Sequence, residues 1–479
     1  MYHLSNKLIE KLNRRGIKYC HWKSNLLLNE ALGGYDDLDF LVAREDIYRF
    51  EIVIKSLGFK EASNRNISFY GIKHFYGFDI DSGNILHLHI YYQVKSGASW
   101  SKSIHFNFED YILNNLTLHT SGVLIPQKHI EFAIFVFRVM LKYSKIHEAI
   151  LVGREHNRTL REIEYLQRGL NRDKLKDFLE RFFPNITLDE FYRFLDVIKN
   201  GSNFKRYILG KRLLSKLSSY RYLTPLEEFW FNLSQLLYRV VNRFFFRDKK
   251  RLHSMGTMIV VTGADATGKS TVTKDLKNWL GKNFTTHQIH FGRPPSTLLT
   301  LPINILIKLS KKRGNGSKST KFSTQKGSNR KSLIYMVRQL ALAYDRYSQI
   351  KKYYRFVSKG DILIVDRYKS ENYYVMDSPR LNPKDYVGLK RKIALLENSL
   401  YSKMPIPDIL FTLTVPIEVA VERNRTRIKE GKESEEFIRV RHKENRDLEY
   451  MAKYIYKIDT DVPYEMELRE IKAKIWRLL

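Results

Sequence analysis

Cysteine is almost absent from this sequence, since its 479 residues include only Cys20. One cysteine cannot form an intramolecular disulfide, and zinc sites built from cysteine pairs are excluded as well. Acidic residues are also scarce: 51 Asp and Glu stand against 83 Lys and Arg, and the formal net charge is +32. The near absence of cysteine indicates a reducing compartment. The positive charge favours polyanionic partners, namely phosphorylated small molecules, nucleic acid or an anionic membrane surface.

Long hydrophobic runs are also missing. The first residues, MYHLSNKLIEKLNRRG, are charged throughout and do not have the pattern of a secretory signal peptide. The least polar stretch, 294–309, is interrupted by Pro302 and Asn304, and it is shorter than the roughly 20 apolar residues that a spanning helix needs. We therefore expect a cytoplasmic protein, with peripheral contact at the inner face of an anionic membrane as an alternative.

The composition, 43% hydrophobic and 13% aromatic, is that of a chain with packed cores. Three zones follow one another, and together they predict a multidomain fold. Residues 1–122 carry short β-rich runs and predict an α+β domain. Residues 123–250 have helical apolar spacing and predict a helical domain. Residues 257–479 alternate strands with helices, which predicts an α/β domain with a parallel sheet. Within the last zone, the Gly-, Ser- and Lys-rich segment 310–331 predicts a basic loop.

The strongest signal is a phosphate-binding loop of the form G-x-x-x-x-G-K-S/T. It follows the strand-like run MIVVT and precedes a helical run, which is the context that such a loop needs. Its glycines let successive backbone N–H groups turn toward phosphate oxygens, and the helix adds its positive N-terminal end. Lys269 then supplies a cation to the phosphates of ATP and Ser270 a hydroxyl to Mg²⁺. The expected nucleotide-binding residues are Gly263, Ala264, Asp265, Ala266, Thr267, Gly268, Lys269, Ser270 and Thr271.

Four further segments accompany this loop. Asp265 lies inside it, Tyr344-Asp345-Arg346 lies in a long helical run, Asp366-Arg367-Tyr368 ends the strand-like run DILIV, and RNRTR closes the segment 407–427. In order and spacing these segments resemble the thymidylate kinases, which belong to the P-loop nucleoside-monophosphate kinases. The resemblance covers about half of the chain. It implies an ATP- and Mg²⁺-dependent phosphotransferase acting on a nucleoside monophosphate, dTMP in that family, and it implies a homodimer.

The resemblance also implies roles for individual residues. Asp265 faces the acceptor sugar, and Arg346 and Arg367 hold the acceptor phosphate. Asp366, at the end of a strand beside the loop, is expected to orient the Mg²⁺ shell together with Ser270. Arg423, Arg425 and Arg427 form either a lid over the transferred group or a solvated helix face. Two positions depart from the family pattern. Leu342 stands where those enzymes carry a base-stacking phenylalanine, and the bulky segment 369–374 replaces the small residues of their base pocket. The family's phosphate-handling residues are therefore matched better than its base-recognition residues. Arg380 is either an additional anion contact or a turn-capping residue.

The first zone contains HWKSN followed by GGYDDLDFLV. This pattern resembles the nucleotidyltransferase fold, in which Gly-Ser precedes an Asp-x-Asp strand. Asp37 and Asp39 share one face of the expected strand and are candidates to hold Mg²⁺. Lys23 stands where that family has glycine. Asp79 or Asp81 is a candidate for a third carboxylate, and His87 and His89 are alternatives to it. A solvated turn and strand edge is the competing interpretation.

Three functions remain after this reading. The first is an ATP-dependent phosphotransferase with a small phosphorylated acceptor. The second is a bifunctional nucleotidyltransferase and kinase acting in bacterial surface-polysaccharide synthesis, because VMDSPRL (375–381) resembles an element of thymidylate-kinase-like proteins encoded with bacterial surface-polysaccharide genes. The third, a basic P-loop protein that binds nucleic acid and has no kinase activity, ranks last because the sequence carries no nucleic-acid-binding signature.

Overall fold

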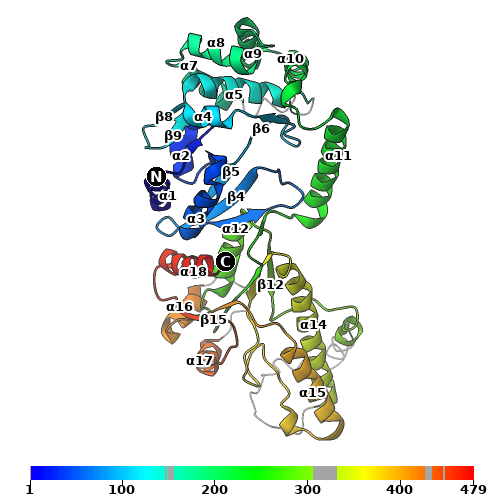
Figure 1. The fold of residues 1–479 in the computed structure, drawn as a ribbon. Coiled ribbons are helices and arrows are strands. Elements are labelled where there is room, and N and C mark those ends of the chain that lie inside the picture. The colour runs from blue at the N-terminus through cyan, green and yellow to red at the C-terminus, as the bar shows by residue number, and fades with distance from the viewer. Residues whose placement is uncertain (1, 146–147, 149–155, 306–331, 427–433, 446–447) are drawn as a thin grey trace. The chain divides into compact units, whose positions relative to one another are not determined.

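The computed structural model describes residues 2–145, 148, 156–305, 332–426, 434–445 and 448–479. The chain divides into two compact units, Met1–Asp248 and Lys249–Leu479 (Figure 1). The segment 310–331 lies outside the described residues. None of the described helices is both long enough and apolar enough to cross a membrane.

The amino-terminal unit is built on a mixed sheet whose strands lie in the order β1-β2-β5-β4-β3. Strands β2 and β5 are parallel and the other neighbours are antiparallel. Buried side chains of α1 and α3 pack against Phe40 and Leu88 of the sheet, and the two helices so cover one of its faces. Asp39 and His89 are register partners and therefore share the opposite face. The bounds are β1 Tyr19–His21, β2 Leu38–Val42, β3 Lys60–Ser63, β4 Ile72–Asp79, β5 Asn84–Tyr91, α1 His3–Arg14, α2 Leu28–Leu32 and α3 Ile47–Ser56.

Two small hairpins and a set of helices complete this unit. Helix α5 is buried on nearly all sides, because it packs against α7, α8, α9 and α10, as Figure 1 shows. The bounds are β6 Val94–Ser96, β7 Ile104–Phe106, β8 Leu116–Leu118, β9 Leu124–Pro126, α4 Glu109–Asn114, α5 Lys128–Lys142, α7 His156–Gln167, α8 Arg172–Phe182, α9 Leu188–Asn200, α10 Asn203–Lys216 and α11 Pro225–Val241. One hydrophobic cluster joins residues of the sheet, such as Leu41 and Tyr91, to residues of these helices. The separation into domains 1–122 and 123–250 stays a prediction.

Helices α5 and α10 cross closely at Gly210. A Cβ atom at this position would lie 2.7 Å from the backbone nitrogen of Ser144 and 2.8 Å from the carbonyl oxygen of Met140. Backbone atoms cannot yield as the end of a flexible side chain can, so a larger residue must separate the two helices.

We expect Gly210→Ala to lower the free energy of unfolding of the amino-terminal unit by about 1–3 kcal/mol. Hydrogen exchange of the full chain, followed over α5 and α10, measures the loss. The matched control is Gly281→Ala at the end of a helix in the other unit, where the nearest atom would lie 4.0 Å from the new Cβ. Equal protection in the two variants would contradict the close crossing.

The carboxy-terminal unit contains a five-stranded sheet in the order β12-β13-β11-β14-β15. All neighbouring strands are parallel, which confirms the expected parallel sheet. The bounds are β11 Thr257–Gly263, β12 Thr286–His290, β13 Ile362–Asp366, β14 Ile409–Thr414, β15 Tyr454–Asp459, α12 Lys269–Gly281, α14 Leu333–Val357, α15 Gly388–Ser402, α16 Ile417–Thr426, α17 Glu435–Glu444 and α18 Tyr464–Leu478. Helices α14 and α15 lie side by side (Figure 1). Strand β11 is central, so its carboxyl end opens between β13 and β14, where parallel sheets place their ligands.

Candidate active site

The loop after β11 has the backbone that a phosphate-binding loop requires. Gly263 and Gly268 have φ angles of 144° and 89°, which glycine adopts without strain. A Cβ on Gly263 would lie 2.4 Å from the carbonyl oxygen of Leu413 on the adjacent strand. Helix α12 starts at Lys269, directly after the second glycine. The positive end of the helix therefore points into the loop.

Lys269 is buried in the loop and 6% exposed. Its Nζ donates a hydrogen bond to the carbonyl oxygen of Ala264. Burial, followed by the neighbouring charge of Arg367, lowers the pKa of Lys269 to about 8. The buried ammonium therefore pays a desolvation cost that an anionic ligand would offset.

The residues expected to hold Mg²⁺ lie together. The Oγ atom of Ser270 donates to Oδ2 of Asp366 over 3.3 Å, and Nε2 of His290 lies 3.9 Å from the same oxygen. The second oxygen of Asp366 is buried and has no hydrogen-bond partner among the described residues. A hydroxyl beside a carboxylate with an unsatisfied oxygen fits the oxygen ligands and bound waters that Mg²⁺ prefers.

Asp265 is the centre of a charged network on one side of the loop. Its oxygens accept hydrogen bonds from Arg367, at 3.0 Å, and from Arg441 of α17, at 2.7 Å. The ring of His442 lies 2.8 Å from its carbonyl oxygen. Burial acts to raise the pKa of Asp265, but Lys269 and the two arginines outweigh it and hold the pKa below its usual value. Asp265 is therefore a stable anion and a poor general base.

Two arginines predicted to hold the acceptor phosphate converge on one carboxylate. Arg346 is 4% exposed and donates to Asp377 over 2.7 Å and to the hydroxyl of Tyr401 over 2.6 Å. Arg367 lies 3.6 Å from the other oxygen of Asp377. Its own φ angle of 72° is unusual for a residue with a side chain and directs the backbone at the end of β13. Asp377 thus joins two fork-shaped cations that can each bind two phosphate oxygens.

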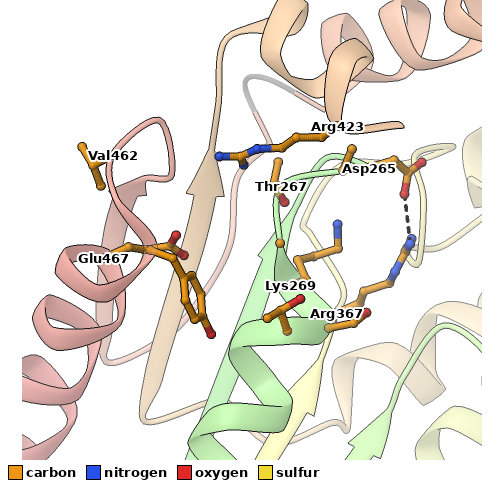
Figure 2. A pocket seen from close by; sticks show the side chains of 12 residues that line it. Asp265, Thr267, Lys269, Arg367, Arg423, Val462 and Glu467 are labelled. Carbon is orange, nitrogen blue, oxygen red and sulfur yellow. Dashed lines mark hydrogen bonds and ion pairs between the residues drawn. The ribbon is translucent and has the colours of Figure 1, made fainter. Parts of the chain in front are cut away.

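A cavity of about 450 Å³ extends from the loop toward the carboxy-terminal helix α18. In Figure 2, Val462 and Glu467 lie on one side of Lys269, and Asp265 and Arg367 lie on the other. Arg423 reaches over the cavity, where it donates to the side chain and the carbonyl oxygen of Thr460. The complete lining is Asp265, Ala266, Thr267, Gly268, Lys269, Ser270, Thr271, Arg367, Arg423, Val462, Tyr464 and Glu467.

Glu467, which lines this cavity, makes the stability of the folded unit depend on pH. It is 4% exposed, and burial, with a further contribution from Asp459, raises its pKa to about 7 despite the opposing charge of Arg423. The folded unit therefore binds this proton more tightly than the unfolded chain does. The resulting stabilisation is complete below pH 4.5 and is lost as the pH rises through about 7.

We expect Glu467→Gln to remove this component of the pH dependence. The thermal midpoint of the carboxy-terminal unit in the wild type should fall more between pH 4.5 and 7 than the midpoint of the variant does. Calorimetric scans of both proteins measure the difference. Glu470→Gln, which alters an exposed carboxylate of the same helix, is the control and should follow the wild type. Parallel curves for Glu467→Gln and the wild type would show that Glu467 is ionised in the folded state.

The other expected lid residues have different surroundings. Arg425 lies 2.7 Å from Glu435 and 3.7 Å from Glu422, with its side chain 59% exposed, and it does not line the cavity. Arg427 lies outside the described residues. Arg380 donates to the carbonyl oxygen of Tyr374.

The acidic pair of the amino-terminal unit is engaged by one lysine and two histidines. Lys23 lies 2.9 Å from Asp39, and His89 lies 3.0 Å from it. His87 lies 2.6 Å from Asp37. The described part of the chain contains no group of three or more His, Cys, Asp or Glu residues that could hold a metal ion. The Mg²⁺ site expected at Asp37 and Asp39 therefore gains no support, and nucleotidyl transfer stays a prediction.

The candidates for a third carboxylate do not join that pair. Asp79 accepts hydrogen bonds from the backbone nitrogens of Leu4 and Ser82. It therefore fixes the start of α1 and the turn after β4. Asp81 lies in the same turn. His89, the other alternative, does contact Asp39.

Sequence reasoning missed three residues of the carboxy-terminal site: Asp377, Arg441 and Glu467. Asp377 is distant in sequence from Arg346 and Arg367, and only the fold brings it to both of them. Arg441 and Glu467 lie on α17 and α18, and nothing in their local sequence separates them from a solvated helix face.

A scan of protein families matches none of them. Among curated proteins, the chain is 25% identical over 227 residues to the uncharacterized ATP-binding protein YghR of Escherichia coli strain K12 and to its counterpart in E. coli O6:H1 strain CFT073. Each match covers 46% of this chain and 86% of the relative.

Two solved structures are also similar in part. A thymidylate kinase from Candida albicans shares 16% identity, covering 47% of this chain and 91% of that one, with a TM-score of 0.27. The deoxyadenosine kinase from M. mycoides with bound dATP shares 15% identity, covering 45% and 98%, also with a TM-score of 0.27. Scores this low establish neither the fold nor the activity of the present chain.

Proposed function

We propose that the carboxy-terminal unit is an ATP-dependent phosphotransferase whose acceptor is a phosphorylated small molecule, with a nucleoside monophosphate such as dTMP as the first candidate. The observation that carries the proposal is the convergence of Arg346 and Arg367 on Asp377. Arg367 itself lies on the opposite side of Lys269 from Val462 and Glu467 (Figure 2). Two guanidinium groups beside a P-loop supply the charge for a second phosphate. The name of the E. coli relative, an ATP-binding protein, supports the choice of donor.

We assign ATP and the acceptor to opposite sides of Lys269. On the donor side, the loop amides and Lys269 bind the phosphates of ATP, and the base extends toward Val462 and Arg423. On the acceptor side, Arg346 and Arg367 exchange Asp377 for the acceptor phosphate. Holding both groups in line supplies most of the catalysis that phosphoryl transfer needs.

The transfer forms a bond between an acceptor oxygen and the γ-phosphorus and breaks the bond from that phosphorus to the β,γ-bridging oxygen, which leaves with ADP. An acceptor phosphate is already deprotonated near neutral pH, with a second pKa of about 6, so no general base is required. Asp265, whose pKa is lowered and which is paired with two arginines, suits this reaction better than one that removes a proton from a hydroxyl.

Mg²⁺, bound at Ser270 and Asp366, would neutralise charge on the β- and γ-phosphates. Asp366 is well placed for this role because it ends β13 beside the loop strand, paired in register with Val261 of β11.

The test is ADP release from ATP and Mg²⁺ over a panel of acceptors. The panel contains dTMP, dUMP, the other nucleoside monophosphates, sugar phosphates, and the matching unphosphorylated nucleosides and sugars. Turnover only with phosphorylated acceptors supports the proposal, and turnover with dTMP identifies the nucleotide. Turnover with an unphosphorylated compound and none with its phosphate would show that Arg346 and Arg367 have a structural role.

A further inference from the structure

We propose that the amino-terminal unit contains a separate, metal-independent site for a phosphorylated ligand, formed by Lys23, Lys102 and Arg138 on the sheet face that carries Asp39. The site lies within residues Met1–Asp248. It is independent of the reaction assigned to the carboxy-terminal unit.

The three cations gather around one pair of aromatic rings. Trp22 and Tyr91 meet edge to face with their centroids 4.9 Å apart. The Nζ atom of Lys23 lies 5.2 Å and 4.6 Å from the two centroids. Lys102 lies 5.5 Å from the centroid of Tyr91, and Arg138 lies 5.4 Å from that of Trp22. These contacts bring cations from the segment after β1, the β6–β7 turn and α5 to one place.

The positive charge here exceeds the negative charge. Asp39 is paired with Lys23 and His89, whereas no described carboxylate lies within ion-pair distance of Lys102 or Arg138. Lys142 adds a further cation to the surroundings. Glu131 and Glu162 are the nearby carboxyl groups, and burial raises the pKa of both, so that each carries less negative charge than an exposed carboxylate. Burial, then the charge of Lys23, lowers the pKa of Lys102 to about 7. Like charges gathered at a partly buried place are costly unless an anion joins them.

A buried donor in the same cluster also lacks a partner. The indole nitrogen of Trp22 has no hydrogen-bond partner among the described residues, and the side chain is 1% exposed. Buried donors in folded proteins nearly always find an acceptor in the protein, in ordered water or in a bound ligand. Because the cluster offers N–H donors, the matching ligand is one whose exposed atoms are acceptors. The oxygens of a phosphoryl group meet this requirement.

The backbone at Lys102 is held in an unusual conformation. Its φ angle is 44°, a value that residues other than glycine seldom adopt. Its nitrogen donates to the carbonyl oxygen of Ala98 over 2.9 Å, which fixes the turn between β6 and β7. Backbone strain of this kind is often found where a side chain is positioned for binding.

Lys23 also explains why the ligand does not need a metal ion. Its ammonium group lies 2.9 Å from a carboxylate oxygen of Asp39. A divalent cation would need this carboxylate as a ligand. The side chain of Lys23 bonds to the hydroxyl of Tyr91 as well, over 2.8 Å. A fixed ammonium group at this point can neutralise a phosphate as a metal ion would.

The test is calorimetric titration of the full chain with pyrophosphate in EDTA, with hydrogen exchange locating the protected segments. The proposed function gives the carboxy-terminal loop an affinity for polyphosphates as well, so the titrations use the Lys269→Met variant throughout. We expect protection of residues 94–106 and 128–142. Adding Lys102→Met or Arg138→Met should weaken binding by about 10–100-fold, whereas adding Lys7→Met, at an exposed position of α1, should not change it.

The proposal would be overturned by pyrophosphate binding that requires Mg²⁺, by equally tight binding of sulfate, or by full affinity in both the Lys102 and the Arg138 variant. Circular dichroism confirms that each variant is folded, and the Arg138→Lys variant tests geometry separately from charge. Partial recovery of affinity in Arg138→Lys relative to Arg138→Met would support direct contact with the anion. Protection confined to residues 263–271 would place all binding in the carboxy-terminal loop and would also overturn the proposal.

Discussion

Replacing Lys269 with methionine is expected to reduce ATP turnover by roughly 10³-fold or more, because the variant loses the only side-chain cation that lies inside the described loop. Methionine keeps much of the length and volume of lysine, so the fold of the loop should persist. The hydrogen bond from Nζ to the carbonyl oxygen of Ala264 is lost, but the turn is also held by the hydroxyl of Thr267, which donates to the same oxygen over 2.9 Å.

The measurement is ADP release at saturating ATP, with the best acceptor from the panel. Lys274→Met is the matched control, because Lys274 is an exposed lysine of the same helix. The control should retain wild-type turnover and show that removing a positive charge from α12 is not enough to abolish activity. Wild-type turnover in Lys269→Met would mean that this loop does not bind the reacting nucleotide.

The parallel sheet of the carboxy-terminal unit could be predicted because its strands are short apolar runs separated by helical runs. Such a pattern is local, and every neighbouring pair in the sheet is parallel as expected. The strand order could not be predicted in the same way. It depends on long-range pairing, such as that of Val261 with Asp366 on one side and with Phe411 on the other.

The candidate site, too, could be predicted from the sequence only in part. The glycines and Lys269 could be identified because the loop is continuous in sequence and its backbone geometry requires those residue types. The contact of Asp265 with Arg441 could not be identified, because Arg441 is distant in sequence and belongs to a helix that contains a second arginine, Arg439. The pairing of Lys23 with Asp39 could not be identified either, because it joins two segments that only the folded sheet brings together.

Replacing Arg367 with lysine is expected to lower kcat by about 10²–10³-fold, because the ammonium group keeps the charge but loses the fork that binds two phosphate oxygens. Arg367 is the residue that links the two carboxylates of the site: it lies 3.0 Å from Asp265 and 3.6 Å from Asp377. It also lines the cavity above the loop. Arg355→Lys, at an exposed position of α14, is the control and should behave as the wild type.

A second readout separates a direct role from a structural one. Burial and the charge of Arg367 both lower the pKa of Lys269 to about 8, so kcat/KM of the wild type should fall as the pH rises through that value and Lys269 loses its proton. In Arg367→Met the pKa of Lys269 should rise, because one of the charges that opposes its protonation is gone. The decline should then move to higher pH, although turnover is lower throughout. An unchanged pH profile together with unchanged turnover would remove Arg367 from the reaction and leave it as a tie between Asp265 and Asp377.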